Sequence, residues 1–335
     1  MKLRTMAGMG WRAAAHRLTG ARCPVNVMLA VTNRCNGQCR YCRIPARHER
    51  DLTTAQIFRL IDEMRAAGTL RLGLWGGEPL LRDDIGAIVS HAHRRGLYVT
   101  MDTNGLLWEQ RRDALDDLDH LIISLDGDRA GHEANRGSGT FDRVMGALES
   151  AAADPRLQVW TLTVLTRHNL GDIDFLLRTA ERLGTRCSFQ ILHHNASLGR
   201  NHEELLPTNE EYREAIRLLL RRRKEGARLS SSSRYLRYLL SWDDYRRSKQ
   251  APPHRGLRCR AGRLYCNVDA DGRVYACSLL AEEVPAQNAV EVGFRAAFEA
   301  IAPLPCQGCT AACFTEYNYL YGLDPVCIYE WVTAR

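Results

Sequence analysis

The chain has 335 residues, of which 45% are hydrophobic and 25% are charged. This is the composition of a folded globular protein with a sizeable core, so an intrinsically disordered chain is excluded. The formal net charge is +7, and nearly all the basic residues are arginine because only three lysines occur. The positive surplus is spread along the sequence and is not gathered in one tail, so composition favours acidic ligands only weakly.

Twelve cysteines occur in tight groups separated by long gaps. Secreted disulfide scaffolds space their cysteines more evenly, whereas clustered thiols in a reducing compartment usually bind metal. Residues 1–24 are predicted to form an N-terminal helical extension. A secretory signal peptide is not expected there, because Arg and His interrupt every apolar run that it would need. No stretch is long and apolar enough to span a membrane. We therefore predict a cytoplasmic metal protein.

Between residues 25 and 195 short apolar runs alternate with helical patterns, which is typical of βαβ units and a parallel sheet. Strands are predicted at 25–31, 70–75, 97–104, 120–127, 157–166 and 186–192. Helices are predicted between them at 54–68, 83–95, 108–117, 140–152 and 171–183. Six such units predict an α/β fold, a partial (β/α)6 TIM-like barrel whose carboxyl strand ends carry the chemistry.

The rest of the chain has a different character. Residues 196–256 are predicted to be a helical connector rich in arginine, and its basic run at 221–224 is interpreted as a solvated helix end, with phosphate binding as the alternative. Residues 257–335 are predicted to be a small separate domain with seven cysteines. The dipeptide Asp271-Gly272 predicts a β-hairpin within it.

Cys35, Cys39 and Cys42 form a C-x3-C-x2-C motif directly after the first predicted strand. Three thiolates from one loop can bind three irons of a [4Fe–4S] cube and leave the fourth iron without a protein ligand. An open metal position is where chemistry occurs. A zinc knuckle is the alternative, although the loop offers no fourth ligand except His48.

This motif, followed by Gly76-Gly77-Glu78-Pro79 after the second strand, resembles the radical SAM (S-adenosylmethionine) superfamily over residues 25–192. The resemblance implies that SAM binds the open iron and is reductively cleaved to a 5′-deoxyadenosyl radical, which abstracts hydrogen from the substrate. By position in the motifs it assigns cofactor contacts to Tyr41, Gly76, Gly77, Glu78, Asn104, Ser124, Asp126 and Arg136. Turn formation or helix capping is the alternative role for three of these residues, Asn104, Ser124 and Asp126.

The later cysteines resemble the SPASM or twitch extension of radical SAM enzymes, which carries auxiliary [4Fe–4S] clusters. The resemblance implies one or two auxiliary clusters held by Cys259, Cys266, Cys277, Cys306, Cys309, Cys313 and Cys327. A complete SPASM module commonly supplies eight thiolates, so seven imply an open or non-cysteine ligand, or a single cluster. A zinc site between Cys306 and Cys327 is the alternative. Cys23 is a candidate for the missing ligand, and Cys187 is predicted to be a core residue.

Two histidines follow the fifth and sixth predicted strands, where substrate contacts are expected in a barrel. We predict His168 and His193 as catalytic residues on the substrate side. The alternative is that both are polar loop residues.

Two classes of reaction fit these features. The first is hydrogen abstraction from a small polar metabolite (a sugar, aminocyclitol or nucleoside), leading to oxidation, elimination or decarboxylation, for example a sugar-acid decarboxylation in nucleoside antibiotic biosynthesis. The second is a SPASM-type peptide or protein maturase, such as a RiPP or sulfatase maturase. Peptide modifiers often carry a leader-binding domain, and only a short segment precedes Cys35, so we expect the small metabolite.

The resemblance also implies a flavodoxin- or ferredoxin-type electron donor. Neither a nucleic acid nor a membrane is expected as a partner, because no basic stripe with interleaved aromatic residues occurs. A zinc-stabilised binding protein without catalysis is the remote third reading.

Overall fold

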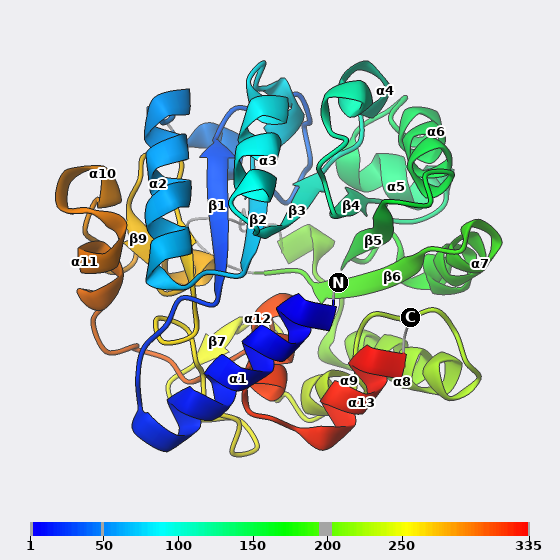
Figure 1. Cartoon of the computed structure of the whole chain (residues 1–335). Coiled ribbons are helices and arrows are strands. Elements are labelled where there is room, and N and C mark those ends of the chain that lie inside the picture. The colour runs from blue at the N-terminus through cyan, green and yellow to red at the C-terminus, as the bar shows by residue number, and fades with distance from the viewer. Residues whose placement is uncertain (1–2, 48–49, 194–202, 334–335) are drawn as a thin grey trace.

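A computed structural model of the chain describes residues 3–47, 50–193 and 203–333. Its centre is a sheet of parallel strands (Figure 1). The first six strands are β1 (Asn26–Thr32), β2 (Arg71–Gly76), β3 (Tyr98–Thr103), β4 (His120–Ser124), β5 (Gln158–Leu165) and β6 (Arg186–Ile191). They lie side by side in chain order, each parallel to the next. The predicted α/β fold built on a parallel sheet is confirmed.

Helices follow the strands and pack on the outside of the sheet (Figure 1). They are α2 (Thr54–Ala67), α3 (Ile85–Arg94), α4 (Trp108–Arg111), α5 (Arg129–Arg136), α6 (Phe141–Ala152) and α7 (Ile173–Leu183). In α2 the Thr53 hydroxyl accepts from the N–H of Gln56, and Gly68 ends the helix in a left-handed conformation. Its buried face consists of Ile57, Leu60, Ile61 and Met64, as the helical spacing predicts.

The C-terminal part continues the same sheet. Strand β8 (Tyr265–Val268) pairs in parallel with β1, and β9 (Val274–Tyr275) pairs antiparallel with β8. The predicted hairpin joins them: the N–H of Asp269 donates to Arg273 O at 2.8 Å, and Gly272 has a φ of +93°. Residues on both sides of the predicted domain boundary at 257 thus share one hydrogen-bonded sheet.

The remaining elements are α1 (Leu3–Thr19), α8 (Asn209–Lys224), α9 (Ser233–Leu240), β7 (Lys249–Gln250), α10 (Ala289–Val292), α11 (Phe294–Glu299), β10 (Gly308–Cys309), α12 (Ala312–Tyr321) and α13 (Pro325–Thr333). Most of them lie at the end of the barrel where the strands begin, whereas α10 and α11 pack beside α2 (Figure 1). Helix α1 packs against α12, with Met9 and Ala13 buried, and crosses the end of the sheet at which the strands begin (Figure 1). The predicted boundary between 195 and 196 lies outside the described residues.

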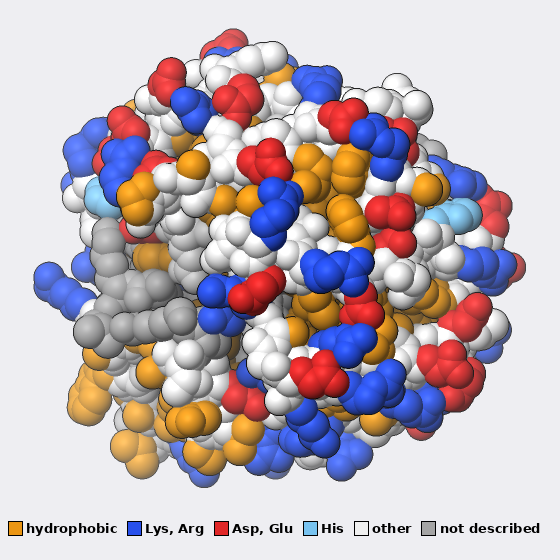
Figure 2. Space-filling model, turned by 90° about the vertical axis from the view of Figure 1, so that its right-hand side faces the viewer, with side chains coloured by type: hydrophobic (Ala, Val, Ile, Leu, Met, Phe, Trp, Pro, Cys, Tyr) orange, Lys and Arg blue, Asp and Glu red, His pale blue; other side chains and the backbone are white. Residues whose placement is uncertain are grey.

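Positive and negative side chains are intermingled on the face shown in Figure 2. The basic run at the end of α8 is part of this pattern, since Arg222 Nε lies 2.7 Å from Asp174 Oδ1 and Arg223 Nη2 lies 3.1 Å from Glu330 Oε2. These pairs support the solvated helix end over the phosphate site. Among the described residues no helix is long and apolar enough to cross a membrane.

Candidate active site and thiol clusters

The loop after β1 is held by backbone contacts to the loop after β2. The N–H groups of Gly77 and Glu78 donate to the carbonyls of Thr32 and Arg34 at 2.8 and 2.9 Å. A Cβ on Gly76 would lie 2.2 Å from Thr32 O, and a Cβ on Gly77 would lie 2.1 Å from Arg34 O. Gly76 also has a φ of +134°. Only glycine permits this approach, which fixes the loop that carries the first thiol motif.

Cys35, Cys39 and Cys42 are gathered in that loop. A Cβ built on Gly37 would lie 3.5 Å from the sulfur of Cys35 and 3.7 Å from that of Cys39. Burial raises the pKa of Cys42 to about 11, and the negative charges of the other two thiolates act in the same direction. A bound cation relieves this repulsion, so the three thiols suit a metal cluster. His48 lies outside the described residues.

Hydrogen-bond donors face two of these sulfurs. Arg136 Nη1 lies 3.7 Å from Cys39 Sγ, and Asn104 Nδ2 lies 3.8 Å from Cys35 Sγ. The N–H of Gly37 donates to Cys35 Sγ at 3.3 Å. Donors to thiolate sulfur stabilise iron–sulfur clusters and tune their potential. This donor set fits the predicted [4Fe–4S] cluster.

The fully buried Asp126 organises the other side of the cluster loop. Its carboxylate accepts from Tyr41 Oη at 2.6 Å, Arg136 Nε at 2.7 Å and the N–H of Val164 at 2.9 Å. The Arg136 guanidinium also lies over the Tyr41 ring, 5.6 Å from its centre. Asp126 thus holds Arg136 and Tyr41 in place beside the cluster loop, and its contact with the cofactor stays a prediction.

Glu78 is likewise buried and occupied by the fold. Its carboxylate accepts from Thr103 Oγ1 at 2.7 Å, from the N–H of Asn104 at 2.7 Å and from the N–H of Leu80 at 3.0 Å. Burial raises its pKa. These bonds tie the end of β2 to the end of β3, and the contact of Glu78 with the methionyl ammonium stays a prediction. Asn104 and Ser124 remain predicted cofactor contacts.

The interior of the barrel contains a cavity of about 210 Å³. Its wall includes Met28, Arg71, Tyr98, Asp102, His120, Ile122, Trp160, Leu162, Gln190, Cys313, Glu316 and Tyr317. Successive side chains of a strand alternate between its faces, so Asn104 and Ser124 lie on the same side as Asp102 and Ile122, two residues before them. Asn104 and Ser124 thus lie toward the carboxyl end of the sheet, on the side of it that faces the cavity.

Polar groups without partners face this cavity. Asp102 and Cys313 line it, and within the described residues His120 Nε2 is buried without a hydrogen-bond partner. Burial raises the pKa of Asp102 to about 6, although the nearby Arg71 opposes the shift. Arg71 itself donates to Asn26 Oδ1, Thr100 Oγ1 and Tyr317 Oη at 2.9, 3.0 and 2.6 Å. The cavity thus offers an acceptor and a thiol to a ligand.

Sequence reasoning missed these cavity residues because it followed loops and strand ends. The signal was present in the period of two along β3, which places Tyr98, Asp102 and Asn104 on one face. Cys313 was assigned to a cluster from its spacing alone.

Four C-terminal thiols come together in a second place. Cys259, Cys277, Cys306 and Cys309 line one small pocket, whose other walls are mostly apolar and include Leu279, Leu304 and Phe314. The β8–β9 hairpin precedes Cys277, and pairing of β10 with β7 holds Cys309. Burial raises the pKa of the Cys277 thiol, and the negative charges of Cys259, Cys309 and Cys306 add to the effect.

The other three predicted auxiliary ligands lie elsewhere. Cys266 is buried within β8, Cys313 lines the barrel cavity, and Cys327 Sγ lies 3.4 Å from Glu316 Oε2. The side chain of Cys23 accepts from Arg12 Nη1 at 3.0 Å and lies apart from the four thiols. The structure therefore supports one four-thiol site in place of seven ligands shared between two.

A single zinc ion fits neither thiol group. No three His, Cys, Asp or Glu side chains in residues 3–47, 50–193 and 203–333 converge to bind one ion. Zinc requires its ligands around one centre, whereas each thiolate of a four-iron cube binds its own iron.

Neither predicted catalytic histidine lines the barrel cavity. His168 is exposed, with Nε2 3.5 Å from Arg40 Nη1. The side chain of His193 contacts Gln190: the Nε2 atoms of the two residues lie 2.6 Å apart. Burial lowers the pKa of His193 to about 4, so the ring is neutral. The structure gives neither histidine a contact with the space where a substrate fits.

Comparison with known proteins identifies the family. The sequence profile of the Radical SAM superfamily matches residues 29–180. PqqA peptide cyclase of Ruegeria pomeroyi is 31% identical over 278 residues, which cover 78% of this chain and 69% of the relative. The chain belongs to the radical SAM superfamily. The [4Fe–4S] cluster and SAM are therefore its cofactors, as predicted.

Two further similarities bear on this radical SAM enzyme. Mycofactocin maturase MftC of Mycobacterium ulcerans is 31% identical over 265 residues, which cover 77% of this chain and 69% of the relative. Streptococcus suis SuiB, in a crystal structure with its precursor peptide SuiA, has the same fold with a TM-score of 0.67 at 15% identity, covering 85% of this chain and 67% of that one.

The prediction of a small-metabolite substrate is wrong. The relatives at 31% identity are named for peptide modification, and they support neither a lyase reaction nor antibiotic biosynthesis. The short segment before Cys35 was no guide to the substrate class.

The glycine contact between the two loops can be tested by Gly77→Ala. The added methyl group overlaps Arg34 O, so we expect the cluster loop to shift, with loss of most iron at the first site and stability lowered by roughly 1–3 kcal/mol. Iron analysis after anaerobic reconstitution and urea unfolding measure the two effects. Gly146→Ala in α6 is the matched control, since nothing lies within 4 Å of its added Cβ. Normal iron content in the Gly77 variant would contradict the argument.

The four-thiol site predicts different effects for two nearby cysteines. Cys259→Ala should remove about four irons per chain, whereas Cys266→Ala should remove none because its thiol lies in the core of β8. Iron and sulfide counting on the reconstituted variants provides the comparison. Equal iron loss in both would mean that Cys266 is a ligand after all.

Proposed function

We propose that this radical SAM enzyme modifies a side chain of a peptide or protein substrate. The observation that carries the proposal is 31% identity to PqqA peptide cyclase over more than three quarters of the chain, with the same identity to mycofactocin maturase MftC. The size of the barrel cavity is consistent with it, since about 210 Å³ is enough for one large side chain. Apolar walls from Met28, Ile122, Trp160 and Leu162 suit the body of such a side chain.

Each group of residues has a distinct part in this function. Cys35, Cys39 and Cys42 would hold the catalytic cluster, which with SAM supplies the chemistry of hydrogen abstraction. Arg136 and Asn104 donate to the cluster sulfurs, and the barrel wall excludes water and orients the side chain to be modified. The cluster loop follows the end of β1 and so lies at the carboxyl end of the sheet, and we place the target side chain in the barrel cavity.

The four-thiol site would hold one auxiliary cluster. Cys259, Cys277, Cys306 and Cys309 supply four thiolates, which is the full ligand set of one cube. This corresponds to a twitch-type extension with a single cluster. We place no second auxiliary cluster in the chain, because Cys266, Cys313 and Cys327 do not share a site.

The substrate class can be tested directly. A short peptide encoded beside the gene is incubated anaerobically with the reconstituted enzyme, SAM and dithionite, and its mass is followed. We expect loss of hydrogen from the peptide in proportion to the 5′-deoxyadenosine formed. Conversion of sugars or nucleosides with an unmodified peptide would refute the proposal.

Asp102 is expected to bind a donor group of the substrate side chain. Asp102→Asn removes the charge and should lower peptide conversion by about tenfold or more while SAM cleavage without peptide continues. Since the pKa of Asp102 is about 6 and the ionised form is the acceptor, the wild-type KM for peptide should rise as the pH falls through 6, and the variant should lack this dependence. Asp113→Asn on the surface is the control. An unchanged pH profile in the Asp102 variant would exclude this role.

A further inference from the structure

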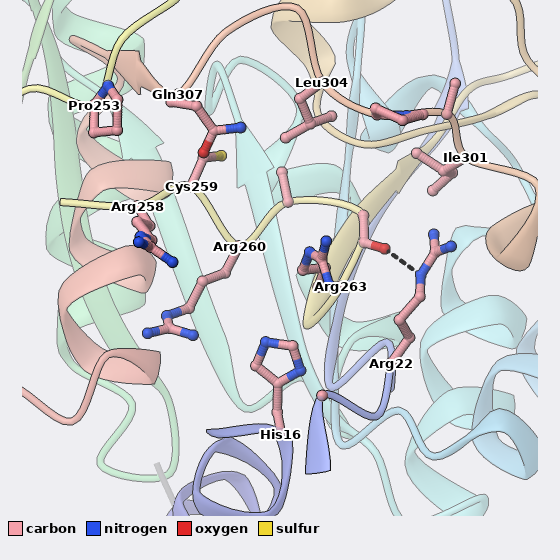
Figure 3. Close-up of a pocket in the computed structure, with 15 residues that line it drawn as sticks. His16, Arg22, Pro253, Arg258, Cys259, Arg260, Arg263, Ile301, Leu304 and Gln307 are labelled. Atoms are coloured by element: carbon pink, nitrogen blue, oxygen red, sulfur yellow. Dashed lines mark hydrogen bonds between the residues drawn. The ribbon is translucent and has the colours of Figure 1, made fainter. Parts of the chain in front are cut away.

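Two large pockets outside the barrel differ in their relation to the place where we put the substrate side chain. The first, of about 770 Å³, lies between the end of α1 and the loop before β8, and Arg258, Arg260 and Arg263 are in its lining (Figure 3). It shares no lining residue with the barrel cavity. The second, of about 530 Å³, is lined by α9, by the ends of α8 and α13 and by the loop between α8 and α9, and it shares Arg186 with the cavity.

Neighbouring residues separate this second pocket from the barrel cavity. Ser230 and Ser231 line the cavity, and Leu229, directly before them, lines the pocket. On α13, Glu330 lines the pocket and Trp331 lines the cavity. The Ser231 hydroxyl is buried at this junction and has no hydrogen-bond partner among the described residues. A buried hydroxyl without a partner suits a polar group of a ligand that occupies both spaces.

The second pocket, called the basic pocket below, carries more positive than negative charge. Its charged lining residues are Arg186, Arg223, Lys224, Arg228, Arg237, Glu181 and Glu330. Glu330 Oε2 lies 3.1 Å from Arg223 Nη2, and Glu181 Oε2 lies 3.1 Å from Arg228 Nε. Both lining carboxylates are thus used in ion pairs, and the other lining cations have no acidic neighbour in the pocket.

Arg186 and Arg237 supply most of the uncompensated charge. Arg186 Nη1 donates to Leu229 O and Arg237 Nη1 donates to Ser233 Oγ, each at 3.3 Å, and neither arginine forms an ion pair in the part of the chain that the structure describes. Burial lowers the pKa of Arg186, and the charges of the two paired arginines act in the same direction. A bound carboxylate relieves this repulsion and accepts strong hydrogen bonds from a guanidinium group.

We propose that the basic pocket binds an acidic residue of the peptide substrate while a nearby residue of the same peptide places its side chain in the barrel cavity. The proposal rests on the peptide-modifying function inferred above. Arg186 faces both spaces, which favours one ligand that fills both. A peptide can do this because successive residues of an extended chain are only about 3.3 Å apart. The pocket thus selects peptides with an Asp or Glu close to the modified residue.

The first test compares two double variants of the reconstituted enzyme, with the peptide encoded beside its gene as substrate. Arg186→Gln/Arg237→Gln removes two charges from the basic pocket, and Arg94→Gln/Arg178→Gln removes two from exposed positions on α3 and α7. We expect the pocket variant to have a KM for the peptide about tenfold above wild type with little change in kcat, because charge-assisted hydrogen bonds are lost outside the cavity. The control should keep the wild-type KM. A wild-type KM in the pocket variant would overturn the proposal.

The charge of the peptide provides the second readout. Each Asp or Glu of the peptide is replaced singly by Asn or Gln. At one position the replacement should raise the KM of the wild-type enzyme about tenfold and have little effect on that of the pocket variant, as expected for two groups that interact. Equal effects on both enzymes, or a substrate peptide without Asp or Glu, would refute the acidic residue. Activation of the wild-type enzyme by inorganic phosphate, with no effect of peptide charge, would assign the pocket to a free anion and also overturn the proposal.

Two results separate this inference from the proposed function. If the wild-type enzyme modifies no peptide, both are refuted. If it modifies the peptide and the pocket variant does so with the same KM, only the role of the basic pocket is refuted. Iron content shows whether the pocket variant is intact, and if it loses iron, Arg237→Gln alone, at an exposed position on α9, must still raise the KM.

Discussion

The close approach of the loops after β1 and β2 is the constraint on which the site depends. The N–H groups of Gly77 and Glu78 donate hydrogen bonds to carbonyls of the neighbouring loop. Gly76 and Gly77 permit this approach because they have no Cβ. The three thiols follow within ten residues of the end of β1, so the sheet register determines where they lie. Glu78 carries the same constraint to β3 through Thr103 and Asn104. The acidic residue of the motif thus builds the frame around the cofactor.

A second constraint comes from β8, which extends the barrel sheet beyond β1. The strand fixes the hairpin and Cys277 relative to the same strand that leads into the first thiol motif. Helix α12 then begins at Ala312 and passes over the barrel opening, which turns Cys313 and Tyr317 toward the cavity. One C-terminal segment therefore performs two tasks: it supplies the auxiliary thiols and it closes the end of the barrel where the strands begin.

Much of this fold could be predicted from sequence, because hydrophobic period and turn residues are local signals. All six barrel strands lie within three residues of their predicted ends, and the Asp271-Gly272 hairpin forms as predicted. The first thiol motif could be predicted from sequence because its three cysteines lie in one loop. The ligands of the auxiliary site could not be predicted in the same way. The spacing of the cysteines does not reveal that Cys266 is buried within β8, whereas Cys309, in the two-residue strand β10, lines the four-thiol pocket. Asp102 was not predicted as a site residue, although the alternation of side chains along β3 places it on the same face as Asn104.

The distribution of charge on the folded protein is also difficult to predict from sequence. The net charge of +7 looks evenly spread along the sequence, but pairing in the folded chain is uneven. Arg222 is neutralised by Asp174 and Glu225, and Arg223 by Glu330, whereas Arg258, Arg260 and Arg263 surround one pocket without a lining carboxylate. The basic run at 221–224 is thus an ordinary helix end, whereas three arginines within six residues, 258–263, line one pocket without a carboxylate. Folding, by choosing which charges are paired, decides where an acidic partner can bind.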